Sequence, residues 1–124
     1  MIDEVVGKVK NDRIVTVGIL GTPSTLREKL YQKPLETNGI NCIEPAEKHF
    51  AILEKIIRNV LAGTVSEKDR KQLGYIADDL RHRGAEAIIL GCTELPLAFP
   101  LQYTAPVYNS VEILAMTLLR RYYE

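Results

Sequence analysis

The residues best suited to chemistry form the run Gly91-Cys92-Thr93-Glu94, which directly follows the apolar stretch 87–90. An apolar stretch that is this short and ends at glycine predicts a buried strand that stops at a loop. A thiol held in such a loop can attack an electrophile or move a proton to or from carbon, and the residue types leave both reactions open. The competing interpretation is a small packing residue, because free cysteines are often buried and inert.

The surroundings of Cys92 also favour ionisation of its thiol. A short helical turn is predicted over 95–99, and N–H groups at the start of a helical turn lower the pKa of a nearby cysteine. We therefore expect a thiolate to be accessible near neutral pH. Cys42 lies within a predicted strand and is interpreted as a packing residue. His49 and His82 lie within predicted helices, and a solvated surface role is expected for His82 at a helix end.

Hydroxyl side chains follow two other predicted strands. Thr22 and Thr25 come after the strand predicted over 14–20, and Ser110 comes after the strand predicted over 105–108. The carboxyl ends of parallel strands meet at one edge of a sheet, so these hydroxyls are expected near the thiol. Together with helix N-termini they would favour a carboxylate or phosphate. Taken singly, each of them is explained equally well as a helix cap.

Several function classes are disfavoured by the sequence. Sixteen basic residues balance sixteen acidic ones, which argues against a nucleic-acid surface or a polybasic membrane signal. The two cysteines are far apart and predict a reducing compartment rather than a disulfide framework. No spacing typical of metal ligands, of a phosphate-binding loop, of a dinucleotide fingerprint or of a serine-hydrolase elbow occurs in the sequence. We expect a soluble cytoplasmic protein without a bound metal.

Helical and strand patterns alternate along the chain. The predicted elements are helix 1–10, strand 14–20, helix 22–38, strand 40–44, helix 46–61, a helix that begins at Ser66 and stops at Gly84, strand 86–90, turn 95–99, strand 105–108 and a final helix capped by Ser110. Pro23 suits the first position of its helix, whereas Pro34 is expected to bend or divide that helix. In the final helix we expect Leu114, Leu118 and Leu119 to face inward.

This alternation predicts an α/β fold, with a small parallel sheet of about four strands and helices on both faces. The whole chain, 1–124, is expected to form a single α/β domain. The sequence shows no internal repeat, low-complexity segment or linker.

Two motifs resemble the second half of the aspartate/glutamate racemase family. The looser motif is Val-Gly-Ile-Leu-Gly-Thr-Pro-Ser-Thr at 17–25, and the more specific one runs from Gly-Ala-Glu to Gly-Cys-Thr-Glu-Leu-Pro-Leu over 84–97. The resemblance covers the chain from about Asp12 onward. It implies one half of a fold in which two similar α/β halves face each other across a cleft, with one cysteine from each half.

The resemblance also implies a cofactor-independent reaction on a small amino acid. One thiolate removes the α-proton and the opposite thiol returns a proton to the other face. By motif position Cys92 would be the catalytic acid/base of the second half, and Thr93 would help to bind the substrate carboxylate or amine. Glu94 would belong to the Cys-Thr-Glu element beside the thiol, and Thr22 and Thr25 would line the cleft.

The sequence departs from the family pattern in three places. The second cysteine of the family lies in an upstream motif with Asn-Thr that has no counterpart before Val15, and Cys42 stands in a different context. Asn109 stands where the family often has aspartate. Leu61 stands where some aspartate-selective members have lysine. Because this chain has no lysine at that position, we do not expect it to recognise the side-chain charge of the substrate in that way.

These departures leave several hypotheses open. The second acid/base could come from a homodimer that brings two Cys92 thiols to one cleft, or from a separate racemase N-terminal half. Segment 106–124 is expected to return onto that half or to be swapped between chains. Alternatively, the chain is an inactive truncated remnant, or it is a non-catalytic amino-acid-binding module that uses the same hydroxyls.

Overall fold

The computed structural model describes residues 2–123, and its centre is a pair of strands made of buried aliphatic residues. β1 (Thr16–Leu20) and β3 (Ala87–Leu90) lie side by side, and β2 (Asn41–Ile43) and β4 (Val107–Asn109) flank them in the order β2-β1-β3-β4. All three pairings are parallel. Continuous burial of both central strands is typical of a parallel sheet covered on two faces. The predicted α/β class is thus confirmed.

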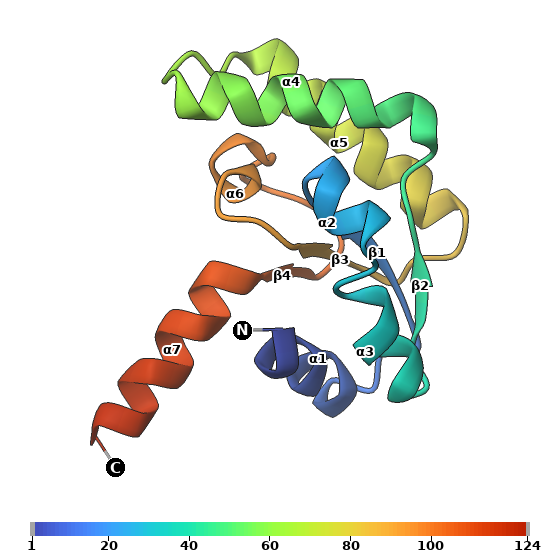
Figure 1. Cartoon of the computed structure of the whole chain (residues 1–124), viewed down its shortest axis with the longest axis vertical. Coiled ribbons are helices and arrows are strands. Elements are labelled where there is room, and N and C mark those ends of the chain that lie inside the picture. The colour runs from blue at the N-terminus through green and yellow to red at the C-terminus, as the bar shows by residue number, and fades with distance from the viewer. Residues whose placement is uncertain (1, 124) are drawn as a thin grey trace.

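Helices cover both faces of this sheet. In chain order they are α1 (Ile2–Asn11), α2 (Pro23–Arg27), α3 (Gln32–Thr37), the 3-10 turn η1 (Glu47–His49), α4 (Phe50–Leu61), α5 (Glu67–His82), α6 (Leu95–Ala98) and α7 (Ser110–Tyr123). α4 and α5 lie on one side of the sheet, and α1 and α3 lie on the other (Figure 1). Within residues 2–123 no helix has both the length and the apolar character needed to cross a membrane.

The helix predicted over 22–38 is divided, although not at the proline. The break lies at Lys29, whose positive φ of 58° ends the first segment. Pro34 falls in the first turn of α3, where its missing N–H costs no intrahelical hydrogen bond. The start predicted at Ser66 is confirmed, because Ser66 and Asp69 form a reciprocal capping box. The stop predicted at Gly84 is also confirmed: α5 ends at His82, and Gly84 follows its cap with a φ of 115°.

The prediction for the start and packing of the last helix is wrong. Ser110 is the first residue of α7, and the cap is Asn109, whose Oδ1 accepts hydrogen bonds from the N–H groups of Val111 and Glu112. Leu118 and Leu119 do not face inward but are more than half exposed. The reason is that α7 runs past the edge of the sheet and packs only on one side, against α1, where Arg121 lies 3.9 Å from Glu4 (Figure 1).

Candidate functional site

Cys92 lies at the carboxyl edge of the sheet, two residues beyond the end of β3. Its side chain is buried, with 8% of its surface exposed. Leu20 and Leu90 are paired in the sheet, and the N–H of Gly91 donates a 2.8 Å hydrogen bond to the carbonyl of Leu20. Leu90 is also paired with Asn109. The register therefore brings the loops after β1, β3 and β4 together, as the sequence predicts.

Burial has a larger effect on the pKa of the Cys92 thiol than the helical turn that follows it. The backbone N–H groups of Leu95 and Glu94 lower the pKa of the thiol, as expected at the start of α6. Desolvation is the larger effect and raises that pKa, and the Glu94 carboxylate raises it further. The expectation of a lowered thiol pKa is therefore wrong for the described structure, and Cys92 rests as the protonated thiol.

Thr22 and Thr25 form a small hydroxyl pair beyond β1. The Thr22 Oγ1 caps α2 by accepting a 3.0 Å hydrogen bond from the Thr25 N–H. The Thr22 hydroxyl donates at 2.8 Å to the Thr25 Oγ1. The Thr22 proton is thus used within the pair, whereas the Thr25 hydroxyl keeps its own proton for an outside acceptor. Both side chains are partly exposed, and Thr93, on the loop after β3, is exposed.

Tyr31 is a site neighbour that the sequence analysis missed. The phenol ring lies directly over the Cys92 loop, so closely that a Cβ at Gly91 would meet the Tyr31 Cε2 at 3.0 Å. Tyr31 is 1% exposed, and its hydroxyl forms no hydrogen bond of normal distance and angle. Gly91 gives the one sequence signal of this packing, because a glycine at a strand end often marks a close approach. That signal does not reveal which residue approaches.

The remaining candidate residues lie away from Cys92. Cys42 is in the middle of β2, paired with Val17 rather than at the carboxyl edge. Burial raises the pKa of its thiol to about 12, with smaller contributions from nearby carboxylates. His49 lies at the start of α4 and His82 is exposed at the end of α5. Among the described residues, no group of three His, Cys, Asp or Glu side chains could hold a metal ion.

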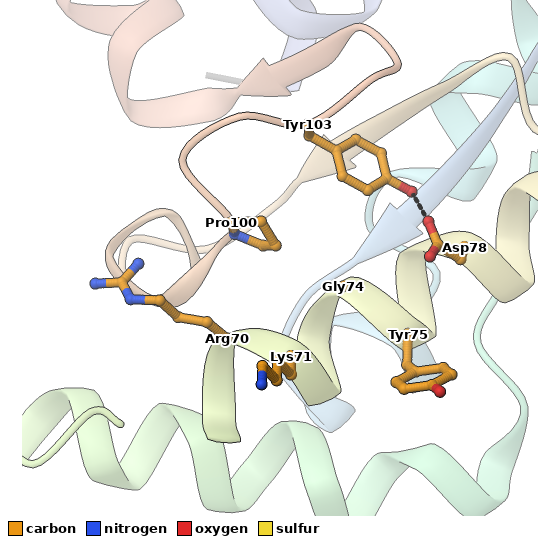
Figure 2. Close-up of a pocket in the computed structure, with 7 residues that line it drawn as sticks. All are labelled: Arg70, Lys71, Gly74, Tyr75, Asp78, Pro100 and Tyr103. Atoms are coloured by element: carbon orange, nitrogen blue, oxygen red, sulfur yellow. Dashed lines mark hydrogen bonds between the residues drawn. The ribbon is translucent and has the colours of Figure 1, made fainter. Parts of the chain in front are cut away.

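A surface hollow of about 330 Å³ lies between α5 and the segment around Pro100 (Figure 2). Tyr103 points toward Asp78 and donates a 2.7 Å hydrogen bond to its Oδ1. Burial and this carboxylate raise the pKa of Tyr103 to about 12. None of the residues that line this hollow is a predicted site residue, so the chemistry predicted for Cys92 is not located there.

Comparison with known proteins places this geometry in a family. Residues 1–118 match the model of the Asp/Glu/Hydantoin racemase family. The chain belongs to this family. The resemblance stated from the two motifs is thereby confirmed, and membership supports a racemase-type function.

Three relatives indicate how much of a racemase the chain spans. An aspartate racemase homologue from Pyrococcus horikoshii OT3 has a TM-score of 0.87 and 31% identity, with coverage of 99% of this chain and 55% of that structure. An uncharacterized protein of Pectobacterium carotovorum subsp. carotovorum is 36% identical over 78% of this chain and 64% of its own length. The glutamate racemase of Aquifex pyrophilus is 29% identical over 72% of this chain and 33% of its own length. The chain therefore spans less than two thirds of each relative.

Proposed function

We propose that this chain supplies one side of an amino-acid racemase site, in which Cys92 exchanges a proton with the α-carbon of an acidic amino acid. Family membership supports the reaction class, and two relatives that are named as an aspartate racemase homologue and a glutamate racemase support the substrate class. The observation that carries the proposal is the meeting of the Cys92 loop with the hydroxyl-bearing loop after β1 at one edge of a parallel sheet.

The protonation state of Cys92 gives this thiol a defined role. A buried, protonated thiol is an acid, so Cys92 donates its proton to the α-carbanion after a base on the opposite face has removed the original proton. The C–H bond electrons stay on the α-carbon in the first step and form the new C–H bond in the second, which leaves Cys92 as the thiolate. N–H groups of Glu94 and Leu95 stabilise that thiolate. In the reverse direction the same thiolate is the base.

Hydroxyl groups beside the thiol would hold the substrate carboxylate. The Thr25 hydroxyl has an unused proton because Thr22 donates to its oxygen. Thr93 is exposed on the adjoining loop and can add a second donor. Donation to a charged acceptor is stronger than a hydrogen bond between neutral groups. These contacts would fix the α-carbon over Cys92, with Glu94 as the carboxylate that receives the thiol hydrogen bond in the resting state.

The second acid/base of this proposal comes from a second racemase domain. Cys42 is unsuited to the role because it lies in β2 and its pKa is about 12. A large share of the exposed apolar residues lies on α7, which suits association with another domain. They are Val111, Met116, Leu118, Leu119, Tyr122 and Tyr123. That domain is either a second copy of this chain or a separate racemase half.

Inversion of configuration tests the proposal. L-aspartate, D-aspartate, L-glutamate and D-glutamate are incubated with the chain at concentrations that span two orders of magnitude, and the enantiomers are separated by chiral chromatography. If a second copy supplies the opposite acid/base, the rate rises faster than the chain concentration. If a separate domain supplies it, inversion appears only when the first half of a family member is added. Cys92→Ser abolishes inversion in either case, and Cys42→Ser is the matched control.

One combination of results would overturn the proposal. It is the absence of inversion under both conditions together with aspartate or glutamate binding that survives Cys92→Ala. That outcome would favour the non-catalytic amino-acid-binding module.

A further inference from the structure

Two buried hydroxyl groups next to the Cys92 loop face each other without a hydrogen bond of normal distance and angle. Tyr31 and Ser110 are 1% and 0% exposed, and neither the Tyr31 Oη nor the Ser110 Oγ forms a hydrogen bond that meets normal distance and angle limits. Buried polar groups are nearly always bonded, so two such groups in one place need an explanation. Their positions in the fold supply it, because they approach the same loop from two different elements.

Tyr31 is held against the Cys92 loop by close packing. The ring contacts Gly91 on the side where other residues carry a Cβ. A Cβ built at Gly91 would lie 3.0 Å from the ring carbon Cε2. Ser110 follows directly after Asn109, which is paired with Leu90 at the end of β3. Burial is the main cause of the raised pKa of Tyr31; a weak hydrogen bond with Ser110 lowers that pKa, and a charged Cys92 raises it.

We infer that Tyr31 is a positioning residue for Cys92, whose buried hydroxyl, oriented by Ser110, donates a hydrogen bond to the thiolate when it forms. In this chain of donors the Ser110 hydroxyl donates to the Tyr31 oxygen, and the Tyr31 hydroxyl shifts toward the sulfur and donates to it once the thiolate forms. The meaning of this contact for catalysis rests on the proposed function, whereas the contact itself can be tested without turnover.

The direction of the effect follows from the charge. A donor next to the thiolate favours the charged form of Cys92 and partly offsets the effect of burial. Burial is the largest cause of the raised pKa of Tyr31, so the phenol stays protonated and remains a donor. The other titratable group that faces the thiol is Glu94, which acts in the opposite direction. Ionisation of Cys92 is therefore set by a donor on one side and a carboxylate on the other.

The test is the pH profile of Cys92 alkylation by iodoacetamide, measured by mass spectrometry on the whole chain without substrate. Tyr31→Phe keeps the ring over Gly91 and removes only the hydroxyl. We expect the thiol pKa to rise by about one unit, which slows alkylation at neutral pH about tenfold. Ser110→Ala should shift the profile in the same direction by a smaller amount.

Tyr108→Phe is the matched control. Tyr108 is also a buried phenol, at 5% exposure, but its hydroxyl donates a 2.6 Å hydrogen bond to Asp12 rather than facing Cys92. Its removal should leave the alkylation profile unchanged, and circular dichroism checks that each variant folds.

An unchanged profile in folded Tyr31→Phe would overturn the inference and leave Tyr31 as a core residue. If Tyr31→Phe did not fold, an unchanged profile in Ser110→Ala would do the same. A shifted profile would support the inference even if inversion of aspartate and glutamate were absent both with the chain alone and with an added first half of a family member, and binding survived Cys92→Ala, which is the result that would remove the proposed function.

Discussion

The two cysteines of this chain differ in a way that exposure alone does not describe. Cys92 is the more buried of the two, whereas Cys42 is partly exposed. Burial raises the pKa of both thiols. Only Cys92 lies beyond the end of its strand, where two backbone N–H groups favour its thiolate. What distinguishes a thiol suited to chemistry from a packing residue is thus its place at the carboxyl edge of the sheet.

The largest effect expected from this comparison is in alkylation. If exposure of the side chain set the alkylation rate, Cys42 would react faster. If the thiolate fraction set it, Cys92 would react faster. With a pKa of about 12, Cys42 is only about one part in ten thousand thiolate at pH 8. We expect iodoacetamide at pH 8 to label Cys92 at least about tenfold faster.

Peptide mapping by mass spectrometry measures both rates in one sample. Since both pKa values lie above neutrality, each rate should fall about tenfold for each unit by which the pH is lowered below 8. Faster labelling of Cys42 would show that exposure, not ionisation, distinguishes the two sites.

The next effect concerns the packing that holds Cys92 in place. In Gly91→Ala the new methyl group would lie 3.0 Å from Tyr31 Cε2 and 3.2 Å from the carbonyl oxygen of Leu20. The ring is fully buried in the core, and the strand carbonyl cannot move without disturbing the sheet. We expect the free energy of unfolding to fall by about 1–3 kcal/mol, measured by urea denaturation.

Gly7→Ala provides the control for this substitution. Gly7 lies within α1, and nothing lies within 4 Å of a Cβ at this position. Alanine should therefore stabilise the helix by about 0.5–1 kcal/mol. Equal effects of the two substitutions would contradict the close packing of Tyr31 on Gly91.

The smallest effect concerns the charge beside Cys92. The Glu94 carboxylate raises the pKa of the thiol, both by its charge and by accepting a hydrogen bond from it. Glu94→Gln removes the charge and should lower the thiol pKa, so that alkylation at pH 7 becomes a few times faster. Glu112→Gln, on the exposed surface of α7, serves as the control for loss of one negative charge. Slower alkylation in Glu94→Gln would show that the carboxylate assists ionisation instead.

Much of the fold follows from local sequence patterns. Apolar strands that alternate with capped helices predict the parallel sheet, and the Ser66–Asp69 box sets the start of α5. The meeting of the loops after β1 and β3 follows from parallel pairing alone. These features depend on short stretches of sequence and on general rules of sheet topology.

The remaining features depend on contacts between distant residues. Tyr31 reaches the Cys92 loop only through tertiary packing against Gly91, 60 positions further along the chain. The pKa of Cys92 depends on burial by the surrounding core, which outweighs the local N–H groups that the sequence suggests. The exposure of Leu118 and Leu119 on α7 could not be predicted either, because they resemble the apolar residues of a helix packed on both sides.

The most direct test of the account is exchange of the α-hydrogen of aspartate and glutamate in D2O, followed by proton NMR with a reducing agent present. A single acid/base can exchange this hydrogen on one face, so the measurement does not need the opposite domain. The account predicts exchange with at least one enantiomer, retained in Cys42→Ser and lost by a factor of about 100 or more in Cys92→Ser. Exchange that persists in Cys92→Ser, or its absence in the unmodified chain, would contradict the role assigned to Cys92.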